Sequence, residues 1–438
     1  MRYLALLMVL AGAGLVPAAT VDWQGGNTDL NVAADWYVIA DDGPNSYTTT
    51  PPARQLPTSA DRVYLRNGTS ATISSGIITA GNVFLGGPAI PGRTGLVTTL
   101  TVGTGGTLQA APAEDSFNNA GYIHVGGAYK TVVNQTGGLV MANGATRSNM
   151  DVFGGQPGVS ATYNISGGTL RIQASAGTAN LRVGCRPEGS AEIGPGTLNQ
   201  TGGMVEIVNV AARNSLCVGG GLGAQGTYNL SDGTLRVSDR KNLRNKFKVG
   251  CGGGVGNFNQ SGGLADFNTL GVGHNDPNDT NIGHGFYNLT GGTLRSRYKV
   301  AVGRTNAAAE IISYGELAVS QSAMIETKIS MAFGDKGSGT LRLLINSAGD
   351  FDIRSGSFWG SDARLVVSLT DGYKPTIGQR WKFLATQDGQ LYDDEKVYQL
   401  NTTFTSVTEG FAVEMDLKTA SYYLVYTGTA APSSAPSK

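Results

Sequence analysis

One short phrase recurs at a nearly constant interval, and it constrains the fold of this 438-residue chain more than any other feature. The phrase takes two forms, Asn-Gln-Thr/Ser-Gly-Gly and Tyr-Asn-x-Ser/Thr-Gly/Asp-Gly-Thr-Leu. Its six asparagines follow one another in steps of 30, 35, 30, 30 and 29 residues, at Asn134, Asn164, Asn199, Asn229, Asn259 and Asn288. A fixed period of this size predicts stacked structural repeats, in which each unit contacts only its neighbours.

Each repeat contains three candidate strands separated by turns. One strand carries the repeated asparagine, and a second follows the Gly-Gly, as in Thr169-Leu-Arg-Ile. The third has the pattern apolar-x-apolar-Gly, in which period-two alternation and a closing glycine predict a half-buried strand and a turn. It occurs as Ile123-His-Val-Gly, Leu181-Arg-Val-Gly, Leu216-Cys-Val-Gly, Phe247-Lys-Val-Gly, Leu270-Gly-Val-Gly, Val300-Ala-Val-Gly and Met331-Ala-Phe-Gly. Three strands in about 30 residues build one coil of an all-β parallel β-helix, and we expect right-handed coiling because parallel crossovers nearly always have that hand.

Alignment of the repeats on Gly-Gly predicts which side chains point into the solenoid. Two rows should point inward, the first made of Leu170, Val205, Leu235, Ala265 and Leu294, and the second of Ile172, Ile207, Val237, Phe267 and Ser296. The residue between them should point outward, and its charge alternates in sign along Arg171, Glu206, Arg236, Asp266 and Arg295. We interpret this row as ion pairs that set the stacking register. A ligand-binding face is the alternative.

The repeated asparagines also have two interpretations. All six lie in Asn-x-Ser/Thr sequons, which would make them glycosylated surface residues in a eukaryotic secreted protein. Their strict register favours stacked turns, in which side-chain amides hydrogen-bond from coil to coil and glycines adopt positive φ beside them.

The sequence divides into five segments, of which one is the repeat region. Residues 1–19 resemble a secretory signal peptide, with a basic start, a short apolar run and small residues near the end. Residues 20–80 are expected to form an N-terminal cap with the first strands, and residues 81–339 the β-helix. Residues 340–428 read as longer strands, forming a β-rich C-terminal cap or a small sandwich. Residues 429–438 are rich in Ala, Pro and Ser and are expected to be a disordered tail.

Composition excludes several classes of partner and of fold. The chain has 32 basic and 32 acidic residues, so it lacks the basic excess of a nucleic-acid-binding protein. After the signal segment, no apolar run is long enough to cross a membrane.

The chain has three cysteines, Cys185, Cys217 and Cys251. Coil spacing separates Cys185 from Cys251 by roughly 10 Å, which is too far for a disulfide, and Cys217 is out of register with both. We therefore predict three thiols and no disulfide.

The strongest metal-like pattern is the loop between His274 and His284. Asp276, Asn278 and Asp279 would supply oxygen ligands there, but the loop lacks the glycine and the closing glutamate of a calcium loop. A solvated Asx-rich turn is the simpler interpretation. No catalytic motif and no cofactor motif is evident, so the sequence predicts no cofactor.

Three motifs lie near the start of the chain: Trp23-Gln-Gly-Gly, Ala33-Ala-Asp-Trp and Ser59-Ala-Asp-Arg-Val. Together with the Tyr-Asn-x-Ser-Gly-Gly-Thr-Leu repeats, they resemble the sequences of autotransporter-type β-strand-repeat proteins. The resemblance implies a secreted or surface-exposed bacterial β-solenoid, and it supplies no catalytic residues. The chain departs from that family at its end, where neither an outer-membrane barrel pattern nor a hydrophobic sorting helix follows.

These observations predict a non-enzymatic extracellular β-solenoid that acts as a structural or adhesive surface protein. The expected location is outside, or on the surface of, a Gram-negative-type bacterium, and the expected state is a monomer. A surface polysaccharide or another surface protein would be the partner. The alternatives are a carbohydrate-active β-helix enzyme, either a polysaccharide lyase or a hydrolase, and a glycan-binding module.

Overall fold

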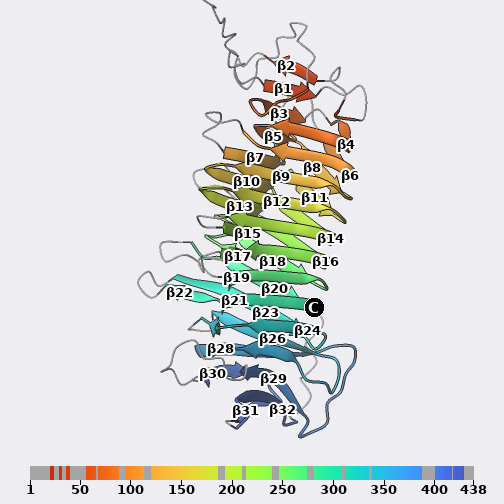
Figure 1. Cartoon of the computed structure of the whole chain (residues 1–438). Helices are drawn as coiled ribbons and strands as arrows, with labels where there is room; N and C mark the ends of the chain where they lie inside the picture. Colours follow the sequence, from red (N-terminus) through yellow and green to blue (C-terminus); the bar gives the residue numbers. More distant parts are fainter. Residues whose placement is uncertain are drawn as a thin grey trace, which may run out of the picture.

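The computed structural model is an elongated stack of parallel β-strands of about nine turns (Figure 1). It describes residues 20–23, 29–31, 36–39, 56–65, 68–87, 95–112, 120–185, 193–209, 214–238, 246–273, 281–306, 311–334, 338–386, 400–416 and 418–428. Among these residues there is no helix. The predicted all-β parallel solenoid is therefore confirmed, whereas its right-handed coiling stays a prediction.

A single coil shows how the repeat folds. Its three strands are β11 (Ala161–Ile165), β12 (Thr169–Ala174) and β13 (Thr178–Val183), and each pairs in parallel with a strand of the coil before and of the coil after. The solenoid thus has three faces. We call them the first, second and third face, after the order of these three strands.

The other strands follow the same order, and several long ones bend from one face to the next. The first face contains β4 (Ser70–Ala80), β6 (Val97–Ala110), β8 (Lys130–Gln135), β14 (Gly196–Asn209), β16 (Gln225–Ser238), β18 (Val255–Gln260), β20 (His284–Leu289), β23 (Ile311–Ser320) and β26 (Gly339–Ile345). The second face contains the later parts of β4, β6, β14 and β16, and also β9 (Leu139–Gly144), β19 (Leu264–Val272), β21 (Gly292–Val302), β24 (Ala323–Thr327) and β27 (Asp352–Ser355). The third face contains β3 (Arg62–Leu65), β5 (Asn82–Leu85), β7 (Ala120–Val125), β10 (Arg147–Val152), β15 (Asn214–Gly220), β17 (Lys246–Cys251), the ends of β19 and β21, β25 (Ser330–Phe333), the start of β28 (Phe358–Leu369) and β30 (Leu400–Val407).

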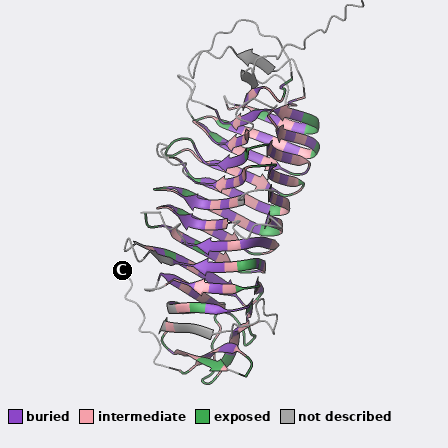
Figure 2. Cartoon of the chain, turned by 60° about the vertical axis from the view of Figure 1, so that its left-hand side comes forward, coloured by how far each residue is buried: buried purple, intermediate pink, exposed green. Residues whose placement is uncertain are grey.

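The core is a set of apolar rows that run along the stack. Leu170 pairs with Val205, Val205 with Leu235, and the row continues through Ala265 to Leu294, as predicted. The second inward row has the predicted register as well, and all of its members are buried. Buried and partly exposed residues alternate along the strands (Figure 2), which is the pattern expected for strands with one face on a core.

Polar groups inside the core give the repeat a two-coil period. Tyr228 is fully buried, and its hydroxyl donates a hydrogen bond to Gln200 Oε1 on the preceding coil at 2.7 Å. Gln200 Nε2 donates in turn to the carbonyl oxygen of Thr234 at 3.0 Å. The pairs Tyr163–Gln135 and Tyr287–Gln260 repeat the contact at the same distance. The Asn-Gln and Tyr-Asn forms of the phrase alternate because each buried tyrosine hydroxyl needs a glutamine partner on the preceding coil.

Antiparallel strands lie at both ends of the stack. At the start, β1 (Thr20–Trp23) pairs in parallel with β3 and antiparallel with β2 (Trp36–Ile39). At the other end, β32 (Ser421–Tyr426) pairs antiparallel with β29 (Arg380–Thr386) and with β31 (Phe411–Asp416). The remaining strand, β22 (Arg304–Asn306), pairs antiparallel with β23.

Parallel stacking extends past residue 339, where we expected the C-terminal region to begin. β26 pairs in parallel with β23 on one side and with β28 on the other, and β28 pairs in parallel with β30. Within 340–428, the change to antiparallel pairing comes with β29, so the first part of this region continues the solenoid. The expected signal segment 1–19 and tail 429–438 lie outside the described residues. The described part of the chain contains no apolar helix of the length needed to span a bilayer.

Candidate functional site

The six repeated asparagines form one ladder along the first face. Asn164 Nδ2 donates to Asn134 Oδ1 at 2.8 Å, and the same bond at the same distance joins each later pair as far as Asn288. The turns beside the ladder are equally regular, with Gly168 at φ 74°. A Cβ atom at Gly168 would lie 2.4 Å from the backbone of the coil below, so only glycine fits there. The asparagine side chains and the glycine turns of this motif therefore hold neighbouring coils together.

The charged row on the second face also joins neighbouring coils. Arg171 lies over Glu206 in the register, and its Nη2 is 2.8 Å from Glu206 Oε2. Arg236 is 3.9 Å from Glu206 on one side and 3.9 Å from Asp266 on the other. Up to this point the geometry follows the alternation of charges in the sequence.

The last predicted pair of this row differs. Arg295 is in register with Asp266, but Arg297 makes the ion pair with Asp266, at 2.8 Å, while Arg295 pairs with Glu326 of the next coil at 3.0 Å. The register of β19 and β21 shifts by one residue after Phe267, and this irregularity brings Arg297 to the carboxylate. The expected Asp266–Arg295 contact is therefore replaced, and the row is longer than predicted.

The loop with Asp276, Asn278 and Asp279 lies outside the described residues, so the calcium-like interpretation stays a hypothesis. Its second histidine, His284, is described, and its ring stacks on Tyr314 with centroids 5.5 Å apart. In the described part of the chain, no three His, Cys, Asp or Glu side chains form a group arranged to hold a metal ion.

The third face differs from the other two because one of its outward rows does not repeat. We call it the variable row; it takes one outward residue from each third-face strand, and the chemistry of these residues changes at almost every step. From start to end it contains Tyr64, Phe84, His124, Asp151, Arg182, Cys217, Lys248, Gly271, Ala301, Ala332 and Trp359. A second outward row on this face still contains an Asn–Asn hydrogen bond, from Asn180 Nδ2 to Asn149 Oδ1 at 2.8 Å.

Asp151 is the most enclosed charge in the variable row. Its carboxylate is fully buried and accepts two hydrogen bonds from Arg182, at 2.6 Å from Nε to Oδ1 and 2.6 Å from Nη2 to Oδ2. The Tyr122 hydroxyl donates a third bond to Oδ2. Burial would lower the pKa of Arg182, but attraction to Asp151 raises it overall, so the guanidinium stays charged. Both carboxylate oxygens accept hydrogen bonds from Arg182 or Tyr122, so we interpret Asp151 as a structural group that holds these two side chains in place.

His124 lies beside this cluster and is held by aromatic rings. Its ring is parallel to Tyr122, with centroids 6.2 Å apart, and meets Phe153 edge-on at 4.9 Å. Burial lowers the pKa of His124, and Asp151 only partly opposes this effect, so the imidazole is neutral near pH 7. Its buried Nδ1 has no hydrogen-bond partner among the described residues.

Aromatic rings occupy the start of the variable row. Tyr64 and Phe84 stack with centroids 5.1 Å apart and an interplanar angle of 19°. Phe84 also contacts Tyr122 at 5.7 Å and His124 at 6.4 Å. All four rings are partly exposed, so together they form an outward aromatic surface over three successive third-face strands.

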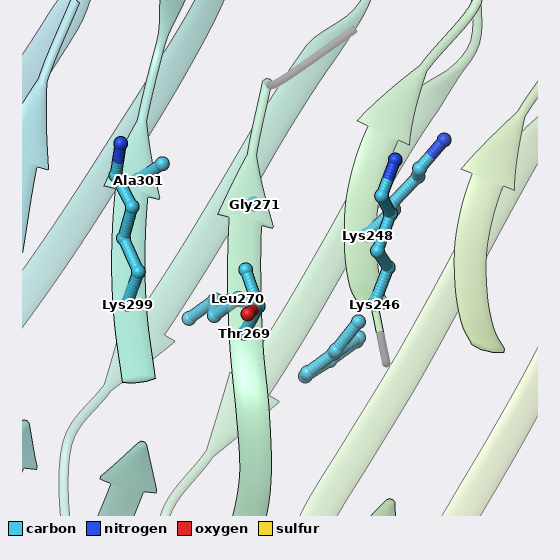
Figure 3. Close-up of a pocket in the computed structure, with 8 residues that line it drawn as sticks. Lys246, Lys248, Thr269, Leu270, Gly271, Lys299 and Ala301 are labelled. Atoms are coloured by element: carbon cyan, nitrogen blue, oxygen red, sulfur yellow. The ribbon is translucent and has the colours of Figure 1, made fainter. Parts of the chain in front are cut away.

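Further along the third face, a shallow groove of about 210 Å³ lies over Gly271 and Thr269 (Figure 3). It is open because Gly271 contributes no side chain to the variable row. Lys246, Lys248 and Lys299 line it from β17 and β21. Each of these lysines also has an interaction within the chain, so their presence alone does not define an anion site.

The variable row could have been found from the sequence. In each apolar-x-apolar-Gly strand the central residue points outward, and these residues read His124, Arg182, Cys217 and Lys248 in order. Asp151 was missed because its strand reads Met-Asp-Val-Phe-Gly, where a phenylalanine separates the alternation from the glycine. The Tyr122–Asp151 contact has no signal along the sequence, since it depends on which coils are adjacent.

Comparison with known proteins adds no family to this description: no protein-family model, no curated protein and no solved structure matches the chain.

Proposed function

We propose that this protein is a non-enzymatic extracellular β-solenoid of the autotransporter-type repeat class, acting as an adhesive surface protein whose third face contacts a polysaccharide. The proposal includes secretion through the segment at residues 1–19 and a location on, or outside, a Gram-negative-type bacterium. The solenoid fold and the signal-like sequence support it.

The observation that carries the proposal is the aromatic start of the variable row. Aromatic faces pack well against the apolar faces of sugar rings and place a polar edge beside the hydroxyl groups. Tyr64, Phe84 and Tyr122 supply such rings on neighbouring coils, and they are partly exposed. A surface that extends along the stack suits an extended polymer better than a small ligand, which would need an enclosed pocket.

A polysaccharide lyase or hydrolase is the second candidate, and the cluster of Tyr122, His124, Asp151 and Arg182 is the observation that favours it. A lyase could use a neutral imidazole or a tyrosine for proton transfer and a guanidinium for a substrate carboxylate. The geometry favours binding over catalysis, because Asp151 is fully buried and burial also raises the pKa of Tyr122 well above its usual range.

One experiment tests both candidates. The mature chain is passed over immobilised neutral and acidic polysaccharides, and the same polymers are incubated with it in solution. Retention on at least one polymer without new reducing ends or unsaturated products is the expected result. Products would support the enzyme instead, and absence of retention across the panel would contradict polysaccharide adhesion.

A further inference from the structure

The three cysteines lie in one corner of the solenoid, after β13 and in β15 and β17. All three are thiols, as predicted. The expected ~10 Å concerned Cys185 and Cys251, whereas the close pair is Cys217 and Cys251. Cys217 Sγ is 3.6 Å from Cys251 Sγ on the next coil. Cys185 Sγ donates a hydrogen bond to the carbonyl oxygen of Cys217 at 3.1 Å and accepts one from the backbone N–H of Gly220 at 3.3 Å.

Gly220 explains why the sulfurs meet. It pairs with Cys251, and the register of β13 and β15 places it beside Cys185, so it separates the two cysteines in the corner row. Because glycine has no side chain, a gap remains there, and Cys217 enters it. A Cβ atom at Gly220 would lie 2.4, 3.1 and 3.4 Å from the sulfurs of Cys217, Cys251 and Cys185, respectively.

We propose that Cys217 and Cys251 are a redox-active pair that forms a disulfide between adjacent coils when the protein meets a hydroperoxide. The two sulfurs lie 3.6 Å apart and must approach to the ~2.0 Å of a disulfide, so the closing movement between the sulfur atoms is about 1.6 Å. Cys185 is the third thiol of the corner and takes no part in the proposed link.

The chemistry balances with one peroxide molecule. Cys217 is partly exposed, whereas Cys185 and Cys251 are buried, so peroxide reaches Cys217 first. The Cys217 thiolate attacks one peroxide oxygen, the O–O bond breaks, and a sulfenic acid and hydroxide form. The Cys251 thiolate then attacks the sulfenic sulfur and releases the second oxygen as water. Two thiols are oxidised, one peroxide is reduced, and two water molecules leave.

The local environment predicts how this reaction depends on pH. The hydrogen bond with Cys185 raises the pKa of Cys217 well above its usual range; the contact with Cys251 lowers it in part, and burial raises it further. Only the thiolate reacts with peroxide, so near pH 7 the reaction should be slow. Its rate should rise about tenfold per pH unit as long as the pH lies below the pKa of Cys217.

The test uses the reduced full-length protein with hydrogen peroxide at pH 7, 8 and 9. After alkylation in denaturant and digestion without reductant, mass spectrometry should find the Cys217 peptide linked to the Cys251 peptide, and the thiol count should fall from three to one. Dithiothreitol should restore three thiols. Cys185→Ser should still form the link, whereas Cys217→Ser should form none and keep both remaining thiols.

Gly220→Ala gives an independent check, because a methyl group would displace the Cys217 sulfur from the gap. It should slow formation of the link at least about tenfold while the circular dichroism spectrum stays unchanged. The proposal is overturned if the wild type keeps three thiols, if sulfinic acid accumulates on Cys217 without a link, or if the link joins two chains. A link confined to Cys185 and Cys251 would also overturn it.

Discussion

The first two faces of the solenoid and its third face share one backbone geometry but use their outward residues in different ways. On the first face, Asn bonds to Asn in an unbroken ladder, and on the second, Arg alternates with acids. In the variable row of the third face almost every residue is different, from Tyr64 to Lys248. The repeated residues of the first two faces therefore hold the coils together. The variable row of the third face is where single residues can have another role.

The buried Tyr–Gln contacts give the strongest test of the repeating part. Gln200→Leu should leave the Tyr228 hydroxyl and the Thr234 carbonyl buried without their partner, lowering the free energy of unfolding by about 2–4 kcal/mol. The double variant Gln200→Leu/Tyr228→Phe should recover at least about 1 kcal/mol of the free energy of unfolding, because it also removes the buried Tyr228 hydroxyl that has lost its partner. Urea unfolding of both variants measures the difference. Equal stability of the single and double variants would mean that the hydroxyl does not need this partner.

On the third face, Asp151→Asn tests whether its buried ion pair is structural. Arg182 would keep its charge in a mostly enclosed position without an anion, so the variant should lose about 2–3 kcal/mol of unfolding free energy. Glu206→Gln on the second face is the matched control, and it should lose less than about 1 kcal/mol because both arginine partners are well exposed. Similar losses for the two variants would remove the distinction between the faces.

Reversing one charge of the second face tests the register of its ladder. Glu206→Arg would place arginines at three successive positions, with Arg171 and Arg236 on either side. We expect a loss of about 1–2 kcal/mol, larger at low salt because screening weakens the repulsion. The measurement is the melting temperature at low and at high ionic strength. A melting temperature that does not respond to salt would contradict ion pairing along this face.

The smallest effect concerns pH and His124. Burial lowers the pKa of His124 in the folded chain below the unfolded value of ~6.5, so the unfolded state binds the proton more tightly. The stability contributed by the neutral imidazole is complete above the unfolded pKa and is lost as pH falls below it. His124→Phe should therefore show a smaller decrease in melting temperature between pH 7.5 and 5.5 than the wild type. Parallel pH profiles would show that His124 does not cause this dependence.

Features that recur could be predicted from the sequence, because each copy of the phrase confirms the register of the others. The buried row from Leu170 to Leu294 is an example, since Gly-Gly fixes the turn before each strand. The Arg297–Asp266 contact was missed, because alignment on Gly-Gly alone does not use the extra residue between Ser296 and Val300 compared with Phe267 and Leu270.

The candidate site was only partly predictable, for a related reason. Cys217 seemed out of register with the other cysteines, and in backbone pairing it is. Its sulfur still reaches Cys251 because the missing side chain of Gly220 leaves room, which depends on three coils at once. Contacts of residues that occur once require the fold to be known first.

The division between repeating and variable faces is tested most directly by comparing two variants on one retained polysaccharide. Phe84→Ala removes the central ring of the aromatic surface, and Arg171→Ala removes an exposed side chain from the second face. The account predicts that Phe84→Ala weakens binding at least about tenfold, which corresponds to ~1.4 kcal/mol, while Arg171→Ala binds as the wild type does. Equal binding by both variants, or weaker binding by Arg171→Ala alone, would contradict it.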